Sequence, residues 1–560
     1  MSNVIQAGSK YLIIIFFAIF VLISFRVQQD TPQTEKNGRY NAQAVLVLLI
    51  HALAFACIAV NIAEGAEEGV TVLNIGILYV LELAYFIFML AVLPHIINLS
   101  RGLNNIMCMF LVIGMFMLAR LSYTKGRRQF LMLLAATVVF LIFQFLYKIF
   151  KGMYKLTWAF LAASMALMLL VMIFAGVSKG ARISIDLGFI TFQPFEFVKI
   201  LFVLFVAGAF NKANSFKTVL ITAIFAAAHL LILVYCTDLG TALIILVVYV
   251  MMVYVATKRP AYVFLGMVGF AVACVAAYFM FSHVRTRVSA WLDPWSDIDN
   301  TGYQITPSLF AIGTGGWFGS GLYQGSPSSI PEVSNDFIFS AISEEMGAIF
   351  AMLLIILCML FALTIFRISI RISHPFYKLT AFGLGAAYAF QVFLTIGGAI
   401  KMIPSTGINL PFISSGGSSL LASMLIVGIV QALYVISEAD VQREREAIRD
   451  RIIVSADSFE DEFEEEYEDG YEEKYEDDDI RPVVIKRTKS KYNYDEGKDA
   501  QKIYISDEER ISADVGSKVA AYKDSRAEDS YGAPDVIIVE RNRTKQKPKS
   551  KVQKIDPDDL

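Results

Sequence analysis

Three polar residues mark the point where a long polar segment runs into an apolar helix. Asp336, Ser340 and Glu344 are spaced by four residues, so in a helix they share one face. The segment before them, residues 283–336, is far longer than an ordinary connection, and such loops are usually functional or disordered. It contains three tryptophans, and a disordered linker is rarely so aromatic. We therefore expect an ordered cap on the membrane surface, and ionisable groups at such a boundary indicate a site.

Charged residues also gather elsewhere in the cap and in two further segments. Glu196 and Lys199 are three residues apart at the start of an apolar run, so they could simply neutralise each other on one helical face. Asp238 starts another apolar run, where the aspartate could simply be an N-cap that accepts hydrogen bonds from free backbone N–H groups. The same alternative is open for Asp336. The binding candidates in these segments are Arg182, Glu196, Lys199, Asp238, Arg285, Arg287 and Glu332.

A fourth segment, residues 401–419, has two prolines, three glycines and several hydroxyls, and no charge after Lys401. Non-helical backbone at membrane depth is tolerated only where protein buries it or where it lines a wet cavity. Hydroxyls and free amides suit sugar or phosphate oxygens, so the segment is expected to rim a cavity. The candidates here are Lys401, Thr406, Ser414, Gly416, Gly417 and Ser418. Carboxylates and cations that meet under a cap suit a polar lipid head group, and they would also suit a transporter gate.

The composition indicates an all-α polytopic membrane protein. The 560 residues are 56% hydrophobic and include 43 phenylalanines, which is too apolar for a soluble domain. The five cysteines have no paired metal spacing and are expected to be small packing residues. About 20 apolar residues cross a bilayer. On that basis about thirteen spans are predicted, centred near residues 11–25, 43–62, 72–94, 105–121, 129–148, 156–177, 197–211, 218–236, 239–257, 261–282, 345–366, 379–399 and 418–436.

Lysine and arginine in the connections predict the orientation of these spans. They place the cap and the N-terminus outside and the C-terminal tail in the cytoplasm, with the first span uncleaved rather than a signal peptide. One connection does not fit the rule, because TKGRRQ at residues 124–129 is basic and yet assigned to the outside. The tail, residues 437–560, is strongly charged, and we expect it to be disordered. It could dock a soluble partner or serve only as a solvated extension.

The order and spacing of the polar motifs resemble the SEDS family (shape, elongation, division and sporulation), whose members include FtsW, RodA and SpoVE. The resemblance covers residues 105–436. The matching motifs are Gly180-Ala181-Arg182, Gln193-Pro194-Phe195-Glu196 with Lys199, Asp238-Leu239-Gly240-Thr241, Arg287-Val288, Asp293-Pro294, Gly302-Tyr303-Gln304, residues 313–321, Pro331-Glu332, Asp336-Phe337-Ile338-Phe339, Glu344-Glu345, Gly347, Pro404, Thr406-Gly407, Leu410-Pro411-Phe412 and residues 414–419. The chain departs from the family pattern at Ser334-Asn335, Asn409 and Ser415.

The resemblance implies a ten-helix catalytic core at residues 105–436. Residues 1–104 would add about three N-terminal spans, and residues 437–560 would form the tail. The implied activity is that of an inverting peptidoglycan glycosyltransferase. It would polymerise lipid II, a disaccharide-peptide on undecaprenyl pyrophosphate, at the outer face of the bacterial cytoplasmic membrane. The implied protein partner is a class B penicillin-binding transpeptidase, and we expect no nucleic acid.

The resemblance also assigns roles to residues. Asp336 matches the family's essential aspartate, and a carboxylate at the mouth of an apolar cavity can accept a proton from the attacking hydroxyl. Glu332 and Glu345 would position substrate or pair with cations. No cofactor is certain, and a divalent cation, Mg or Mn, stays open as a partner of the pyrophosphate. The candidate cations for the departing pyrophosphate are Arg182, Lys199, Arg285, Arg287 and Lys401.

Two other functions stay open: a flippase or transporter for lipid-linked sugars, and a non-catalytic scaffold for division proteins. A flippase needs polar groups along the whole path through the bilayer. The cytoplasmic halves of the predicted spans are almost unbroken apolar residues, which favours chemistry at one face. The motifs are shared by division, elongation and sporulation members, so they do not distinguish these processes.

Overall fold

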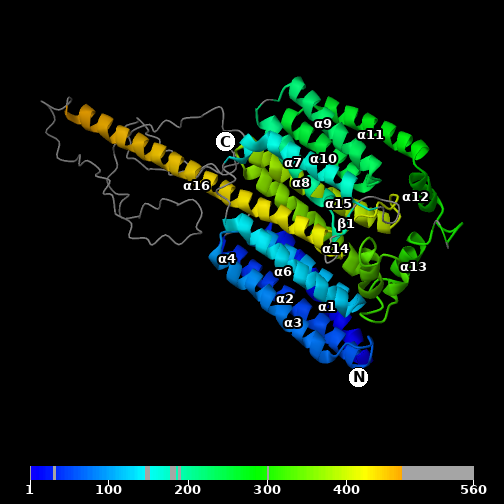
Figure 1. Cartoon of the computed structure of the whole chain (residues 1–560). Helices are drawn as coiled ribbons and strands as arrows, with labels where there is room; N and C mark the ends of the chain where they lie inside the picture. Colours follow the sequence, from blue (N-terminus) through cyan, green and yellow to red (C-terminus); the bar gives the residue numbers. More distant parts are fainter. Residues whose placement is uncertain are drawn as a thin grey trace, which may run out of the picture. The chain divides into compact units, whose positions relative to one another are not determined.

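The protein is almost entirely helical. The computed structural model describes residues 2–28, 33–145, 152–176, 184–186, 191–212, 214–298, 300 and 302–468. The sheet found among these residues is a small antiparallel pair, β1 (Ile185–Asp186) and β2 (Thr191–Phe192). Twelve of the described helices are long and apolar enough to cross a membrane, which confirms the predicted architecture (Figure 1).

A helix is found at the position of each of the thirteen predicted spans. The one outside the twelve is α8, an 18-residue helix that carries three charged side chains. The helices are α1 (Ser2–Val27), α2 (Gln33–Ala63), α3 (Val72–Ile87) with the π-helical turn η1 (Phe88–Val92) and α4 (Leu93–Ile96), α5 (Arg101–Leu121), α6 (Tyr123–Phe145), α7 (Thr157–Phe174) after the 3-10 turn η3 (Met153–Leu156), α8 (Phe195–Lys212), α9 (Phe216–Tyr235), α10 (Leu239–Thr257), α11 (Pro260–Met280), α14 (Ile338–Arg371), α15 (Pro375–Ala399) and α16 (Gly417–Glu468).

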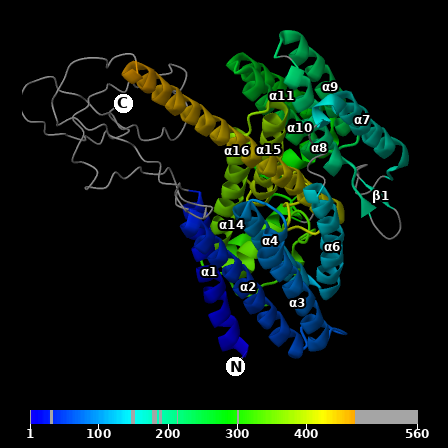
Figure 2. The same ribbon diagram turned by 90° about the vertical axis from the view of Figure 1, so that its left-hand side faces the viewer.

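The chain divides into two compact units, and the larger one, residues 1–29 and 38–446, contains the cap and the residues that line the site. Within it α1, α2 and α3 lie side by side (Figures 1 and 2). Helix α1 packs along α14, where the rings of Phe17 and Phe350 stack at 4.3 Å. The N-terminal helices, which lie outside the resemblance, are therefore attached directly to the core.

Helix α5 lies at the centre of this unit, with 94% of its most apolar window buried. A helix that is apolar on every side is expected to be buried in this way. A Cβ at Gly114 would lie only 2.8 Å from the carbonyl oxygen of Phe412, so the missing side chain lets the backbone of residues 412–413 pack on the helix. Close packing at this position fixes the segment that rims the site.

The predicted cap is ordered over its described residues. It contains α12 (Ser282–Leu292), α13 (Ile305–Gly315) and the 3-10 turn η4 (Pro327–Ser329). Figure 1 shows α12 and α13 at the end of the helices where the N-terminus is marked. Side-chain contacts fasten the cap to other elements at that end, since Lys10 of α1 donates to the carbonyl of Gly319 at 2.8 Å.

The backbone of the cap also forms hydrogen bonds with the backbone of α14. Gly347 has φ +84° and breaks the helix, which leaves backbone groups without intrahelical partners. The glycine-rich part of the cap bonds them: Ala348 N donates to Gly316 O at 2.8 Å, and Ser320 N donates to Glu344 O at 2.9 Å. Irregular backbone between membrane helices is stable only when its polar groups are paired in this way. The break therefore holds the cap against the start of α14.

Three of the segments that were assigned to the same side of the membrane lie at one end of the helices. The acidic loop after α2 and the connection between α5 and α6 lie at the same end, because Ser122 donates to the Glu67 carboxylate at 3.2 Å. The basic start of α6 meets the cap there, since Lys125 Nζ donates to Ser334 Oγ at 3.2 Å. The basic connection that did not fit the charge rule thus does share an end with the cap.

The last helix is longer than predicted. Residues 418–436 were expected to end the core, but α16 continues to Glu468. Its extension is rich in glutamate and arginine, which are strong helix formers. The remainder of the predicted disordered tail, residues 469–560, lies outside the described residues.

Candidate functional site

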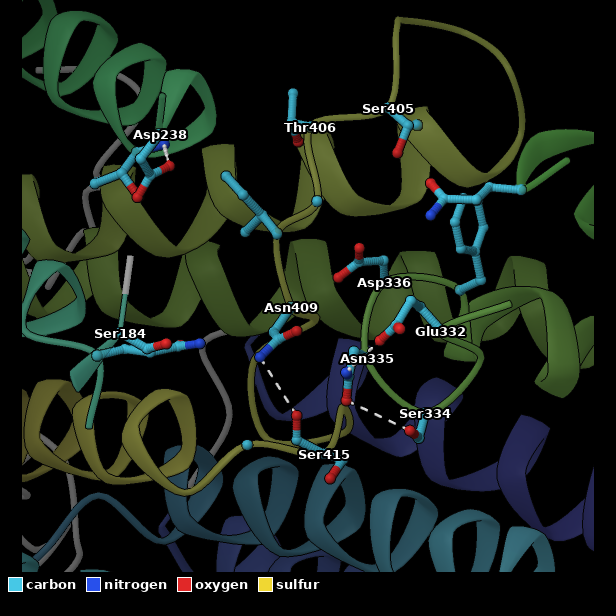
Figure 3. Close-up of a pocket in the computed structure, with 18 of the residues that line it drawn as sticks. Ser184, Asp238, Glu332, Ser334, Asn335, Asp336, Ser405, Thr406, Asn409 and Ser415 are labelled. Carbon is cyan, nitrogen blue, oxygen red and sulfur yellow. Dashed lines mark hydrogen bonds between the residues drawn. The ribbon is translucent and has the colours of Figure 1, made fainter. Parts of the chain in front are cut away.

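A cavity of about 1090 Å³ opens between the cap, the starts of four helices and the segment that follows α15 (Figure 3). Every part of its wall comes from the same end of the helices, the end that carries the cap. The predicted site residues that line it are Glu196, Asp238, Arg287, Glu332, Asp336, Lys401, Thr406, Gly416, Gly417 and Ser418.

Asp336 lies at the end of a tight turn and points into this cavity (Figure 3). The backbone N–H groups of Asn335 and Asp336 both donate to the carbonyl of Glu332, at 2.9 and 3.1 Å. The turn is tied to the opposite wall, because Ser415 N donates to Ser334 O at 2.7 Å. The N-cap of α14 is Phe337, whose side chain makes no capping bond. The geometry therefore favours a cavity group over the N-cap alternative for Asp336.

Arg287 reaches the same space from the cap. Its Nη1 donates to the carbonyl of Ser405 at 3.1 Å. Desolvation by the cavity walls lowers the pKa of Arg287, whereas the charges of Asp336 and Asp238 raise it. Arginine ordinarily titrates above 12, so the side chain stays cationic. The site thus places a permanent positive charge within the electrostatic reach of the candidate base.

Helix α12, which carries Arg287, is fastened to the segment after α15. Trp291 Nε1 donates to Lys401 O at 3.1 Å, and Lys401 Nζ donates to Leu292 O at 3.4 Å. Lys401, one of the predicted cations, therefore also anchors the cap.

Gly407 lies next to both the Asp336 carboxylate and the Arg287 guanidinium. It has φ +71°, and a Cβ there would lie 3.5 Å from Asp336 Oδ2 and 3.7 Å from Arg287 Nη2. Positive φ and this proximity both favour glycine.

Replacement of Gly407 by valine is expected to lower the catalytic rate by about tenfold or more, because the side chain would fill the space between the two groups and move the reacting atoms. The rate of product formation by the purified protein measures this effect. Gly65→Val is the matched control, since Gly65 has φ +88° with nothing within 4 Å of its Cβ position. Equal losses in the two variants would mean that backbone strain alone is responsible.

Asp238 combines both readings that the sequence left open. Its carboxylate caps α10, accepting from Thr241 N at 3.0 Å, and it lines the cavity. Burial raises the pKa of Asp238, and the bonds from Thr241 partly offset this. A carboxylate accepts several hydrogen bonds, so the residue can cap the helix and contact a polar ligand at the same time.

Glu196 lines the cavity, but Lys199 does not. Lys199 Nζ lies 2.8 Å from Glu196 Oε2 and donates to Gln391 Oε1 at 2.7 Å, and only 3% of the lysine is exposed. The mutual neutralisation that the spacing allowed is therefore present in the structure.

Three other predicted residues also lie away from the cavity. Arg285 is exposed and donates to the carbonyl of Phe279 at 3.0 Å. Glu345 is fully buried against Arg120, at 2.7 Å. Ser414 is buried and donates to the carbonyl of Asn335, so it braces the turn before Asp336. The remaining predicted cation, Arg182, lies outside the described residues.

The cavity also contains side chains that the sequence analysis did not select. Lys125, Arg128 and Gln129 reach it from the start of α6, and Asn409 reaches it from the segment after α15. The sequence did contain an indication of the first three, because the connection TKGRRQ is basic although it was assigned to the outside. Positive charge that departs from the charge rule in this way indicates a site at the cap end.

Comparison with known proteins gives a consistent picture. Residues 100–438 match the family of cell cycle proteins FtsW, RodA and SpoVE. The peptidoglycan glycosyltransferase RodA of Mycobacterium tuberculosis is 38% identical over 274 residues, which cover 45% of this chain and 57% of that protein. The probable peptidoglycan glycosyltransferase FtsW of Halorhodospira halophila is 35% identical over 304 residues, covering 51% and 75%. This chain thus spans little more than half of the mycobacterial relative.

Among solved structures, one chain of a peptidoglycan synthase complex has the same fold. The TM-score is 0.54 at 24% identity, and the match covers 61% of this chain and 98% of the other. This likeness concerns the arrangement of the helices alone.

Proposed function

The chain belongs to the FtsW/RodA/SpoVE family of cell cycle proteins, and on that basis we propose that it is a peptidoglycan glycosyltransferase that polymerises lipid II. The observation that carries the proposal is the cavity in which Asp336 and Arg287 face the same space. A base and a cation so placed suit the transfer of a sugar from a pyrophosphate.

In the proposed reaction the free hydroxyl of the acceptor disaccharide attacks the anomeric carbon of the donor sugar. Asp336 takes the hydroxyl proton as the new glycosidic bond forms. The bond between the anomeric carbon and the pyrophosphate oxygen breaks, and the lipid pyrophosphate leaves with the electron pair. Arg287 stabilises its developing negative charge, and attack from the opposite side inverts the anomeric centre.

The position of the polar wall favours chemistry over transport. All charged groups of the cavity come from the end of the helices that carries the cap. A flippase would need polar groups along the whole path. We propose that this end faces the outside of the cytoplasmic membrane and that the tail faces the cytoplasm. We further propose a class B penicillin-binding transpeptidase as partner, supported by the fold shared with a chain of a peptidoglycan synthase complex.

Purified protein with fluorescent lipid II, followed by a gel of glycan lengths, tests the function. Glycan strands support the polymerase. Movement of lipid II across vesicle membranes without glycan strands would instead support a flippase. A folded protein with neither activity would support the non-catalytic scaffold.

A divalent cation, Mg or Mn, is a separate proposal. Among the described residues no three His, Cys, Asp or Glu side chains gather closely enough to hold a metal ion. Mg²⁺, however, is commonly held by one or two carboxylates together with substrate phosphates. Asp238, which lines the cavity and whose charge acts on Arg287, would supply such an oxygen beside the pyrophosphate, where the ion would neutralise charge on the leaving group.

Removal of divalent cations with EDTA is then expected to lower the polymerisation rate by about tenfold or more, and added Mg²⁺ should restore it. The measurement is the rate of lipid II consumption at a fixed ionic strength. A rate that EDTA does not change would contradict the cation.

A further inference from the structure

The basic start of α6 is not used by the mechanism above. Lys125 and Arg128 both line the cavity, and Lys125 Nζ donates to Ser334 Oγ at 3.2 Å, two residues before Asp336. The cation between them, Arg127, is exposed, lies 5.8 Å from the ring centre of Tyr123 and does not line the cavity. The three side chains share one helical turn, but only two of them reach the site.

These two cations differ from the other buried or cavity-side cations in how their charge is balanced among the described residues. Within the part of the chain that the structure describes, no carboxylate lies within 4 Å of the charged nitrogens of Lys125 or Arg128. Exposed basic groups in the wall of a cavity, unpaired with acids, are suited to an anionic ligand. The pattern differs from that of Lys199 and Arg120, whose charges are offset by Glu196 and Glu345.

The neighbouring wall adds positive potential. Helix α16 begins at Gly417, and Gly417 and Ser418 both line the cavity. Gln129 ties α6 to this helix start, because its Oε1 accepts from Gly416 N at 3.2 Å. The N-terminus of a long helix carries a partial positive charge and favours phosphate groups. The cations and the helix start therefore act on the same region of the cavity.

This region lies apart from Arg287. Figure 3 shows Ser405, the acceptor of the Arg287 bond, and Ser334, the acceptor of the Lys125 bond, on opposite sides of Asp336. The cavity thus has two cationic walls with the candidate base between them.

We propose that Lys125 and Arg128 bind a second lipid-linked diphosphate, that of the acceptor substrate. The inference rests on the proposed function, in which both substrates carry a diphosphate. The donor's diphosphate is bonded to the reacting carbon, so it must lie beside Asp336, where Arg287 is. The acceptor's diphosphate is separated from the attacking hydroxyl by the length of a disaccharide, so it needs its own cations farther along the cavity.

The test compares Lys125→Gln and Arg128→Gln with Arg127→Gln, which removes the same charge from a side chain outside the cavity. Loss of one charged hydrogen bond is expected to raise KM for lipid II about tenfold in each cavity variant. The kcat should stay within about twofold of the wild-type value, because neither residue touches the reacting atoms. Arg127→Gln should match the wild type, and thermal melting confirms that all three variants fold.

Binding of lipid II to the full-length protein, measured without turnover, separates this inference from the proposed function. Weaker binding in the two cavity variants supports the diphosphate site even if the wild type makes no glycan strands. Conversely, the wild type could make glycan strands while the two cavity variants bind and react like Arg127→Gln. That result would overturn the diphosphate site and leave the proposed polymerase activity intact. A fall in kcat alone, with KM unchanged, would also overturn it.

Discussion

Replacement of Asp336 by asparagine is expected to lower the rate of lipid II polymerisation by about 10²–10⁴-fold. The amide has nearly the same shape as the carboxylate, but it cannot take the proton of the attacking hydroxyl. The turn that presents the side chain should survive, because its bonds run from the N–H groups of Asn335 and Asp336 to the carbonyl of Glu332. The initial rate of glycan-strand formation at saturating lipid II gives the size of the loss.

The matched control is Asp293→Asn. Asp293 is an exposed carboxylate of the same cap, and it accepts from Trp295 N at 3.2 Å without lining the cavity. Its removal should change the rate by no more than about twofold. If the Asp336 variant were folded, bound lipid II and made strands at the wild-type rate, the role of general base would be wrong.

The membrane explains why much of this site could be predicted from the sequence. Buried polar groups are so costly among apolar helices that the few present stand out. Asp238 and Asp336 were selected because each adjoins an apolar run, and Arg287 because it lies in the cap; all three line one cavity. The helices were found for the same reason, since long apolar runs leave few alternatives to a transmembrane helix.

The sequence did not show partners that lie far away along the chain. Glu345 was expected to position substrate or to pair with a cation, and its partner is Arg120, 225 residues away. Ser414 holds the carbonyl of Asn335 instead of facing the ligand. Periodicity shows which face of a helix is polar, but it does not show which other helix meets that face. The break of α14 at Gly347 was hidden for a similar reason, because its stabilising bonds come from the cap.

The same buried pair supports the second large prediction. Replacement of Arg120 by glutamine is expected to reduce the free energy of unfolding by about 3–5 kcal/mol, because it leaves the Glu345 carboxylate buried without a counter-charge. Glu345 is fully buried, and Arg120 is 13% exposed. Unfolding in mixed detergent, followed by circular dichroism, measures the change. Arg127→Gln should stay within about 0.5 kcal/mol of the wild type, as expected for an exposed side chain.

The double variant Arg120→Gln/Glu345→Gln identifies the cause. If an uncompensated charge is responsible, removal of the acid as well should recover most of the lost stability. Glu345 Oε1 also accepts from Tyr323 N at 3.1 Å, and Arg120 donates to Gly325 O, so the pair fastens the glycine-rich part of the cap to α5. A double variant as unstable as Arg120→Gln would show that these bonds to the cap, and not the charge balance, are what the pair contributes. In either case the loss of stability would fall on the cap segment that leads to Asp336, the base of the proposed reaction.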